Sequence, residues 1–152
     1  MISISLDRAS YAAGDTITAT ISVRPGKPTK ARGLFAMLVC SEQEQVKTTV
    51  VLDQYTFDRH KEMGIPYSSN METRIAKRES ILFSQEKNVS PAREFSGEES
   101  FTVQFTLPAS AAPTSLEFGH DNKIHIWKLR ARLDIPLAID ENAESDVFVE
   151  GL

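Results

Sequence analysis

The stretch from Phe101 to Asp140 constrains the fold of this chain most, because it contains two long runs with an apolar residue at every second position. The first run breaks at Leu107-Pro108, a bend rich in proline and alanine follows, and the second run begins near Lys123. A period of two places one set of side chains on one face of an extended strand. Two long strands joined by a proline-containing crossing predict a β-sandwich, in which the chain passes between packed sheets. The alternating apolar residues are Phe101, Val103, Phe105 and Leu107, then Trp127, Leu129, Ala131, Leu133 and Ile135.

Shorter runs on either side of this stretch predict further strands. The turn at residues 11–15 contains Gly14, which can adopt a positive φ, and residues 24–30 and 88–97 are expected to form connections. Seven apolar residues in succession, up to Cys40, predict a central strand that is covered on both sides. The sequence therefore predicts an all-β fold, an immunoglobulin-like antiparallel β-sandwich of two packed sheets, in one domain over residues 1–152. The additional strands are expected at residues 2–6, 16–23, 33–40, 46–52, 79–87 and 145–151.

Residues 55–77 show neither a helical nor a strand period. A long loop or insertion of this kind in a compact domain is often functional, although an ordered cover over the core and simple disorder are the alternatives. Its aromatic residues and methionines are of the types that interfaces favour. The candidate partner-binding residues in this segment are Tyr55, Phe57, Met63 and Tyr67.

Composition limits the classes of partner and compartment. The net charge of −4 argues against nucleic acid as the main partner. The chain has one cysteine, Cys40, which favours a reducing compartment, and in its apolar surroundings the thiol is expected to be inert. No signal peptide is recognisable, and no apolar run approaches the ~18 residues of a membrane span. We therefore expect a cytoplasmic protein with no membrane insertion.

With this order of elements, the sequence resembles the arrestin family, specifically an arrestin N-terminal-type domain, and the similar domain of the bacterial sporulation-control group. In that family a turn with tyrosine and glycine precedes the second strand. A phenylalanine-rich strand, Leu-Pro, a bend, Pro-x-Ser and a long strand ending in proline occur near the end of the domain. The matching segments here are residues 11–17, 30–34, 95–97, 101–108, 113–115 and 124–136.

Two departures limit what the resemblance implies. Arrestins pair two sandwiches, whereas one fits in this chain, so the inter-domain polar core and hinge have no counterpart. Ala13 stands where the family often has proline. By its place in the chain, the 55–77 segment resembles the central loop with which arrestins probe receptors, but no individual contact transfers.

Candidate catalytic and metal sites are weak. The chain has His60, His120 and His125, and the last two lie near Asp121, but their spacing matches no known ligand pattern. The common nucleophile, phosphate-binding and dinucleotide motifs are absent from the sequence. We expect no enzyme activity, no cofactor and no metal; a metal-assisted hydrolase at His120 and His125 is the least favoured alternative.

The second long run carries three cations on its polar face: Lys128, Arg130 and Arg132. They could bind an acidic or phosphorylated segment, as the resemblance to arrestins suggests. The alternative, which we favour, is a solvated face whose cations pair with glutamates such as Glu79, Glu98 or Glu99.

Taken together, these patterns predict a non-enzymatic protein–protein interaction domain, an adaptor or scaffold whose protein partner the sequence does not identify. Open edge strands at residues 2–6 or 147–149 could recruit a peptide or a second copy of the chain; the alternative is an edge blunted by its own charges, Asp146 and Glu150. The alternative is a small-ligand or carbohydrate-binding sandwich that uses Trp127 and the tyrosines, although Trp127 is expected to be buried.

Overall fold

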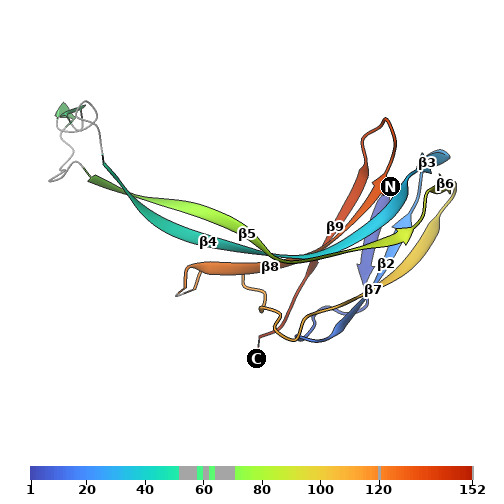
Figure 1. The fold of residues 1–152 in the computed structure, drawn as a ribbon, viewed down its shortest axis with the longest axis horizontal. Helices are drawn as coiled ribbons and strands as arrows, with labels where there is room; N and C mark the ends of the chain where they lie inside the picture. Colours follow the sequence, from blue (N-terminus) through green and yellow to red (C-terminus); the bar gives the residue numbers. More distant parts are fainter. Residues whose placement is uncertain (52–57, 60–61, 64–70, 120, 152) are drawn as a thin grey trace.

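The computed structural model describes residues 1–51, 58–59, 62–63, 71–119 and 121–151. The described chain is built from antiparallel strands, as the alternating patterns predict (Figure 1). None of its helices is long and apolar enough to cross a membrane. The strands are β1 (Ile2–Leu6), β2 (Thr16–Val23), β3 (Thr29–Ala31), β4 (Gly33–Val51), β5 (Met71–Ser90), β6 (Arg93–Phe95), β7 (Glu99–Thr106), β8 (Lys123–Asp134) and β9 (Glu141–Val147).

The strands form two main sheets that face each other. One sheet has the order β1-β2-β7, the other has the order β5-β4-β8-β9, and β3 and β6 make a small pair at one end. Figure 1 shows the long strands β4 and β5 crossing from this sandwich into a two-stranded arm. The predicted all-β sandwich of two packed antiparallel sheets is therefore confirmed.

The core lies between the inward faces of the two sheets. On β8 the alternation predicted from the sequence holds: Trp127, Leu129, Ala131 and Leu133 are buried, while Lys128, Arg130 and Arg132 between them face outward. Trp127 is the largest buried side chain, and its indole Nε1–H donates to the carbonyl oxygen of Ala112 at 2.8 Å. The hydrogen bond satisfies a polar group that burial would otherwise leave unpaired. Trp127 is thus a core residue, as expected.

One side of the sandwich is closed by contacts between β1, β9 and the segments that flank them. Tyr11 N–H donates to the Phe148 carbonyl at 2.9 Å, and Glu150 N–H donates to the Tyr11 carbonyl at 2.7 Å. Thr114 N–H donates to the Val149 carbonyl at 2.9 Å, so the crossing between β7 and β8 is fixed to the same side. These bonds join the turn around Gly14, whose φ is 86°, to the end of the chain that the structure describes.

The arm is the main difference from the sequence prediction. Residues 33–51 form one strand, β4, rather than two, and β5 covers residues 71–90 rather than 79–87. β8 pairs with β4 only as far as Glu44. Beyond that residue, the described part of β4 is paired with β5 alone. Side chains in this arm are exposed on both faces, which removes the alternation that identifies a half-buried strand. Residues 71–77 of the expected loop therefore belong to β5.

Two other boundaries also differ. Residues 88–90 end β5 and 93–95 form β6, where a turn was expected. The last strand is β9 at Glu141–Val147 rather than 145–151, because its inward positions hold Glu141, Ala143 and Ser145 before Val147 and so show no apolar alternation. β1 lies at an edge of its sheet, as predicted for residues 2–6, and β9 lies at an edge of the other sheet. Of the predicted edge residues 147–149, Val147 ends β9 and Val149 forms an isolated bridge with Tyr11.

The inward face of β8 should carry much of the stability. Leu129 is fully buried, so Leu129→Ala is expected to lower the free energy of unfolding by about 2–5 kcal/mol through lost burial and a cavity. Thr102→Ala, on the exposed face of β7, should change it by less than about 0.5 kcal/mol. Urea unfolding of both variants measures the difference, and equal losses would show that Leu129 is not part of the core.

Candidate functional site

The outer face of the four-stranded sheet brings the predicted cations together with apolar side chains. Across β4 and β8, Phe35 lies opposite Arg132, Met37 opposite Arg130, and Val39 opposite Lys128. Phe35 and Met37 are only half-buried. The face therefore carries an apolar row on β4 beside a cationic row on β8.

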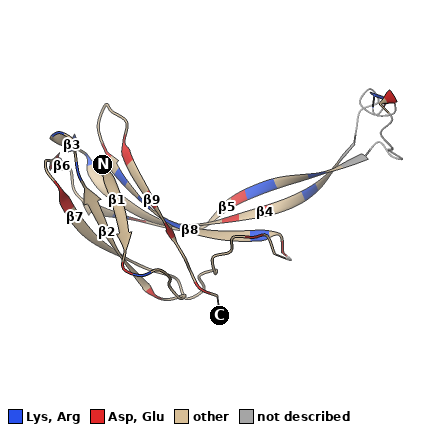
Figure 2. Ribbon diagram, turned by 180° about the vertical axis from the view of Figure 1, so that it is seen from behind, with Lys and Arg blue, Asp and Glu red and all other residues tan. Residues whose placement is uncertain are grey.

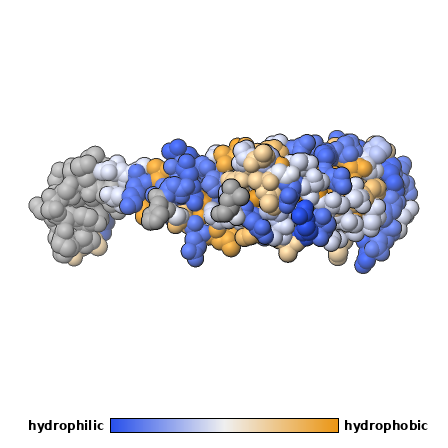
Figure 3. Space-filling view, turned by 90° about the horizontal axis from the view of Figure 1, so that it is seen from below, coloured by the Kyte–Doolittle hydropathy of each residue, from blue (hydrophilic) through white to orange (hydrophobic). Residues whose placement is uncertain are grey.

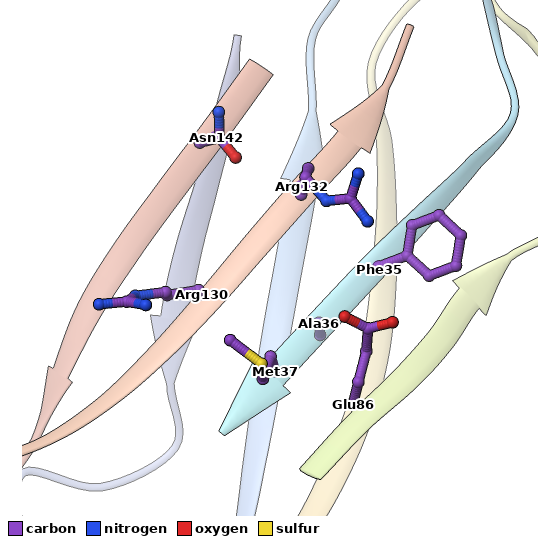
Figure 4. Close-up of a pocket in the computed structure, with 7 residues that line it drawn as sticks. All are labelled: Phe35, Ala36, Met37, Glu86, Arg130, Arg132 and Asn142. Atoms are coloured by element: carbon purple, nitrogen blue, oxygen red, sulfur yellow. The ribbon is translucent and has the colours of Figure 1, made fainter. Parts of the chain in front are cut away.

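A shallow hollow lies at the centre of this face (Figure 4). The guanidinium of Arg132 points toward Phe35, and its central carbon lies 5.1 Å from the ring centroid. That distance is within the range of a cation–π contact, which holds both side chains against the sheet. The hollow is lined by Phe35, Ala36, Met37, Glu86, Arg130, Arg132 and Asn142.

Each predicted cation has an acidic partner. Arg130 Nε lies 3.0 Å and Lys128 Nζ 3.4 Å from the carboxylate of Glu144 on β9. Arg132 Nη1 lies 3.3 Å from Asp140 Oδ2 and 3.9 Å from Asp134 Oδ2. A negative ligand must therefore compete with carboxylates that are already in place. The arrangement is therefore the alternative that the sequence favoured, a solvated face whose cations are paired with acidic side chains.

The identity of these acidic partners was predicted wrongly. Glu98 pairs with Arg24 at 2.9 Å and Glu99 pairs with Arg93, both away from the stripe. Glu79 lies opposite Gln43, further along the arm. Glu144 instead lies directly across from Arg130 in the β8–β9 register, which the sequence did not reveal because β9 was not recognised there.

Asp140 organises the end of this face. Its Oδ1 accepts the Ile135 N–H at 3.0 Å across the hairpin that joins β8 to β9. That backbone hydrogen bond, followed by the hydrogen bond and charge of Arg132, outweighs desolvation and lowers the pKa of the Asp140 carboxyl below its ordinary value. The carboxylate thus fixes both the hairpin and the outermost cation of the stripe.

Of the residues proposed in the 55–77 segment, Met63 does not line the hollow of this face. Met63 lies in the described part of the chain and is exposed, and its N–H donates to the Arg59 carbonyl at 3.0 Å. Tyr55, Phe57 and Tyr67 lie outside the described residues. The three cations share one surface, and the loop residues stay a separate prediction.

The chain resembles a known protein family and a solved structure. Residues 1–150 match the family model described as Arrestin (or S-antigen), N-terminal domain. The chain belongs to the arrestin N-terminal domain family. A crystal structure of Spo0M, a sporulation control protein from Bacillus subtilis, is similar, with a TM-score of 0.64 and 18% sequence identity. The similarity covers 99% of this chain and 49% of that chain, so this chain spans about half the length of Spo0M. No curated protein matches the sequence.

Among the candidate metal residues, His125 lies in the described part of the chain and makes hydrogen bonds to protein groups. His125 Nε2 lies 2.9 Å from Glu42 Oε2, and its backbone N–H donates to Ser115 Oγ at 2.9 Å. In the part of the chain that the structure describes, no three histidine, cysteine or acidic side chains form a cluster that could hold a metal ion. His60 and His120 lie outside the described residues. His125 is a satisfied edge histidine in this structure.

Cys40 is buried beneath the same sheet. Desolvation, with a smaller contribution from the nearby charge of Glu42, raises the pKa of its thiol to about 11. A thiol in this state is a poor nucleophile at neutral pH. The expectation of an inert cysteine agrees with these surroundings.

Sequence reasoning missed the apolar half of the site. The run before Cys40 was taken as covered on both faces, whereas in the arrestin-type sandwich only its even-numbered residues face the core. Phe35 and Met37 face outward because β8 and β9 continue the sheet sideways and no further layer of the described chain covers it. The only feature that could have indicated that Phe35 and Met37 face outward was the register of the neighbouring strand.

The charge on Asp140 should show in the pH dependence of stability. A carboxyl with a lowered folded-state pKa stabilises the fold above its unfolded pKa and loses that effect as the pH falls through the folded pKa. Asp140→Asn keeps an oxygen acceptor for Ile135 but removes the charge, so it should lower the melting temperature at neutral pH and not below about pH 3. Melting curves across pH test this, with Asp146→Asn as a control for loss of a carboxylate from this face. A pH-independent difference would contradict the assignment.

Proposed function

We propose that this chain is a non-enzymatic interaction domain, an adaptor or scaffold that binds other proteins in the cytoplasm. The observation that carries the proposal is the outer face of the four-stranded sheet, where the half-buried Phe35 and Met37 lie beside paired arginines. Aromatic, methionine and arginine side chains are the types enriched in protein interfaces. The partners here are proteins rather than nucleic acid, because acidic residues already balance the cations of this face.

The arm supports the same function. Beyond Glu44 it is a two-stranded ribbon, and an isolated ribbon is only marginally stable in water. Figure 2 shows basic segments on both of its strands. Ile75 is exposed among these charges, with 65% of its surface accessible. A projecting ribbon of this composition is suited to contact a second protein, which would also stabilise it.

Other surface features agree with a binding role rather than a small-molecule one. In the space-filling view, hydrophobic side chains gather over the middle of one face, between more hydrophilic ends (Figure 3). Trp127, the side chain on which a carbohydrate site would depend, has only 2% of its surface exposed. The buried free cysteine suits the reducing conditions of the cytoplasm.

The first test addresses the outer face. Arg130→Glu with Arg132→Glu places like charges beside Glu144 and Asp140, so it should reduce capture of partners from a lysate by about tenfold or more. Lys27→Glu with Lys30→Glu makes the same change in net charge on an exposed loop and on β3, and should leave capture unchanged. Circular dichroism and melting curves establish that both proteins are folded. Unchanged capture by the folded stripe variant would remove this face from the proposal.

The second test addresses the arm. Gln45 lies opposite Lys77, so replacing residues 46–76 with an Asn-Gly turn closes the hairpin in its existing register. The core lies outside this segment, and the shortened protein should therefore fold. We expect it to lose part of the captured set of proteins. If neither this variant nor the outer-face variant changes the captured set of proteins, neither surface binds the partner.

A further inference from the structure

The inner surface of β5 has no opposing strand. The four-stranded sheet ends in β5, whereas the facing sheet ends one strand earlier, in β7, for the residues that the structure describes. Phe83, Gln85 and Lys87 lie across from the buried residues of β4 and so point toward the interior. Gln85 is nevertheless exposed, as is the bulged residue Leu82. A fourth strand beside β7 would cover this surface.

The edge of β7 that would receive such a strand is open. Phe105 and Val103 pair with β2, while the backbone groups of alternate residues point the other way. Those outward groups belong to Thr102, Gln104 and Thr106. In the described chain no strand is hydrogen-bonded to them. An open row of N–H and C=O groups is a template for another strand.

Lys87 occupies this opening. Its ammonium group donates a hydrogen bond to the carbonyl oxygen of Gln104, and it lies 5.1 Å from the centroid of the Phe105 ring. It therefore satisfies one acceptor that an added strand would use. Inward-pointing lysines are a known means of keeping an edge from pairing indiscriminately. The contact marks one end of the opening.

From Lys87 the opening continues as two adjoining hollows between β5 and the chain that follows β7. Phe83 and Pro108 line both of them, and Trp127 and Cys40 lie at the far end. Lys87 is the one charged side chain among the described residues that line either hollow. The opening thus has a cation at one end and the apolar side chains of Phe83, Pro108 and Trp127 toward the other, with polar side chains such as Gln85 between them. An occupant complementary to it carries a negative charge followed by apolar groups.

Bulges delimit the β5 wall of this opening. The register of β4 and β5 shifts at Leu82 and again at Val89, so the segment between them is a regular stretch bounded by two irregular residues. Bulges at a sheet edge redirect side chains and end pairing, and they are commonly functional features. Here they confine regular strand geometry to the part of β5 that faces the opening.

We infer that the open edge of β7 binds an extended segment of a partner protein, with an acidic residue facing Lys87, an apolar residue two positions away facing Gln85, and an apolar residue four positions away facing Phe83. The segment adds a fourth strand to the three-stranded sheet. Its backbone bonds to Thr102, Gln104 and Thr106, its carboxylate replaces the Gln104 carbonyl as the partner of Lys87, and its apolar side chains cover the apolar side chains of the opening. This inference rests on the proposed interaction function and assigns it a site distinct from the outer face and the arm.

The test uses the full chain and a defined probe. The acetylated, amidated hexapeptide Thr-Glu-Thr-Val-Thr-Val places glutamate and the two valines on one face of a strand. Titrated into isotope-labelled protein, it should shift the backbone amide signals of Thr102, Gln104 and Thr106, and change the fluorescence of the sole tryptophan, Trp127. A peptide with lysine in place of glutamate should bind about tenfold more weakly. Amide shifts confined to β1, β9 or the outer face, or no shifts at all, would overturn the site.

Variants of the chain should reverse the preference between two peptides, which nonspecific binding would not do. Lys87→Met keeps the length of the side chain but removes its charge, so it should weaken the glutamate peptide about tenfold and strengthen the matching all-valine peptide. Lys27→Met, in an exposed loop, is the matched control and should change neither. Gln104→Pro removes an outward N–H and the exposed side-chain hydrogen bond to Thr18 Oγ1, but it leaves the backbone bonds to β2 in place. It should abolish binding of both peptides in a folded protein. Equal effects of Lys87→Met on the two peptides would contradict the role of Lys87.

Capture experiments separate this inference from the proposed function. If Gln104→Pro leaves capture unchanged and the outer-face variant abolishes it, the chain is an interaction domain but the β7 edge is not its site. If the native chain captures no partner and binds no peptide, both fail. Sedimentation of the native chain shows whether a second copy occupies the edge instead. If the native chain is a dimer that Gln104→Pro dissociates, the occupant is a second copy of the chain, and the inference of a segment from another protein is wrong.

Discussion

The rest of the structure depends on how two sheets of unequal width pack against each other. The shared core is anchored by Trp127, Leu129 and the buried residues of β2 and β4. On one side, hydrogen bonds from Tyr11, Thr114 and Glu150 tie the sheet edges together. On the other side the narrower sheet stops at β7, so the inner surface of β5 is covered only in part and Lys87 reaches across to Gln104. One closed side and one open side follow from this difference in width.

The same geometry explains why the candidate surfaces lie where they do. β8 and β9 extend the wider sheet sideways, which exposes the row formed by Phe35 and Met37 next to the cationic stripe. β4 and β5 extend it lengthwise into the arm (Figure 1). Among the described residues, neither surface contains three or more histidine, cysteine or acidic side chains grouped so that they could hold a metal ion. The chain belongs to the arrestin N-terminal domain family and spans about half the length of Spo0M.

The elements that could be predicted from the sequence are those with one buried face. The alternation in 101–107 and 123–135 identified β7 and β8 because every second residue there packs into the core. The arm was not recognised because both of its faces meet solvent, and β9 was hidden because its inward positions hold Glu141, Ala143 and Ser145 rather than large apolar residues. The stripe on β8 was found, but its partners were not, because which carboxylate lies opposite Arg130 depends on the register of a hairpin. The opening beside β7 depends on the relative width of two sheets, which no local pattern encodes.

The most direct measurement of this account is backbone hydrogen exchange along β7 in the native protein without a partner. If β7 is an open edge, the amides of Val103 and Phe105, which pair with β2, should be strongly protected. Those of Thr102, Gln104 and Thr106 should exchange orders of magnitude faster, because they face the opening. An alternating pattern would support the unequal-sheet architecture. Uniform protection along β7 would show that its edge is already paired and would contradict the account.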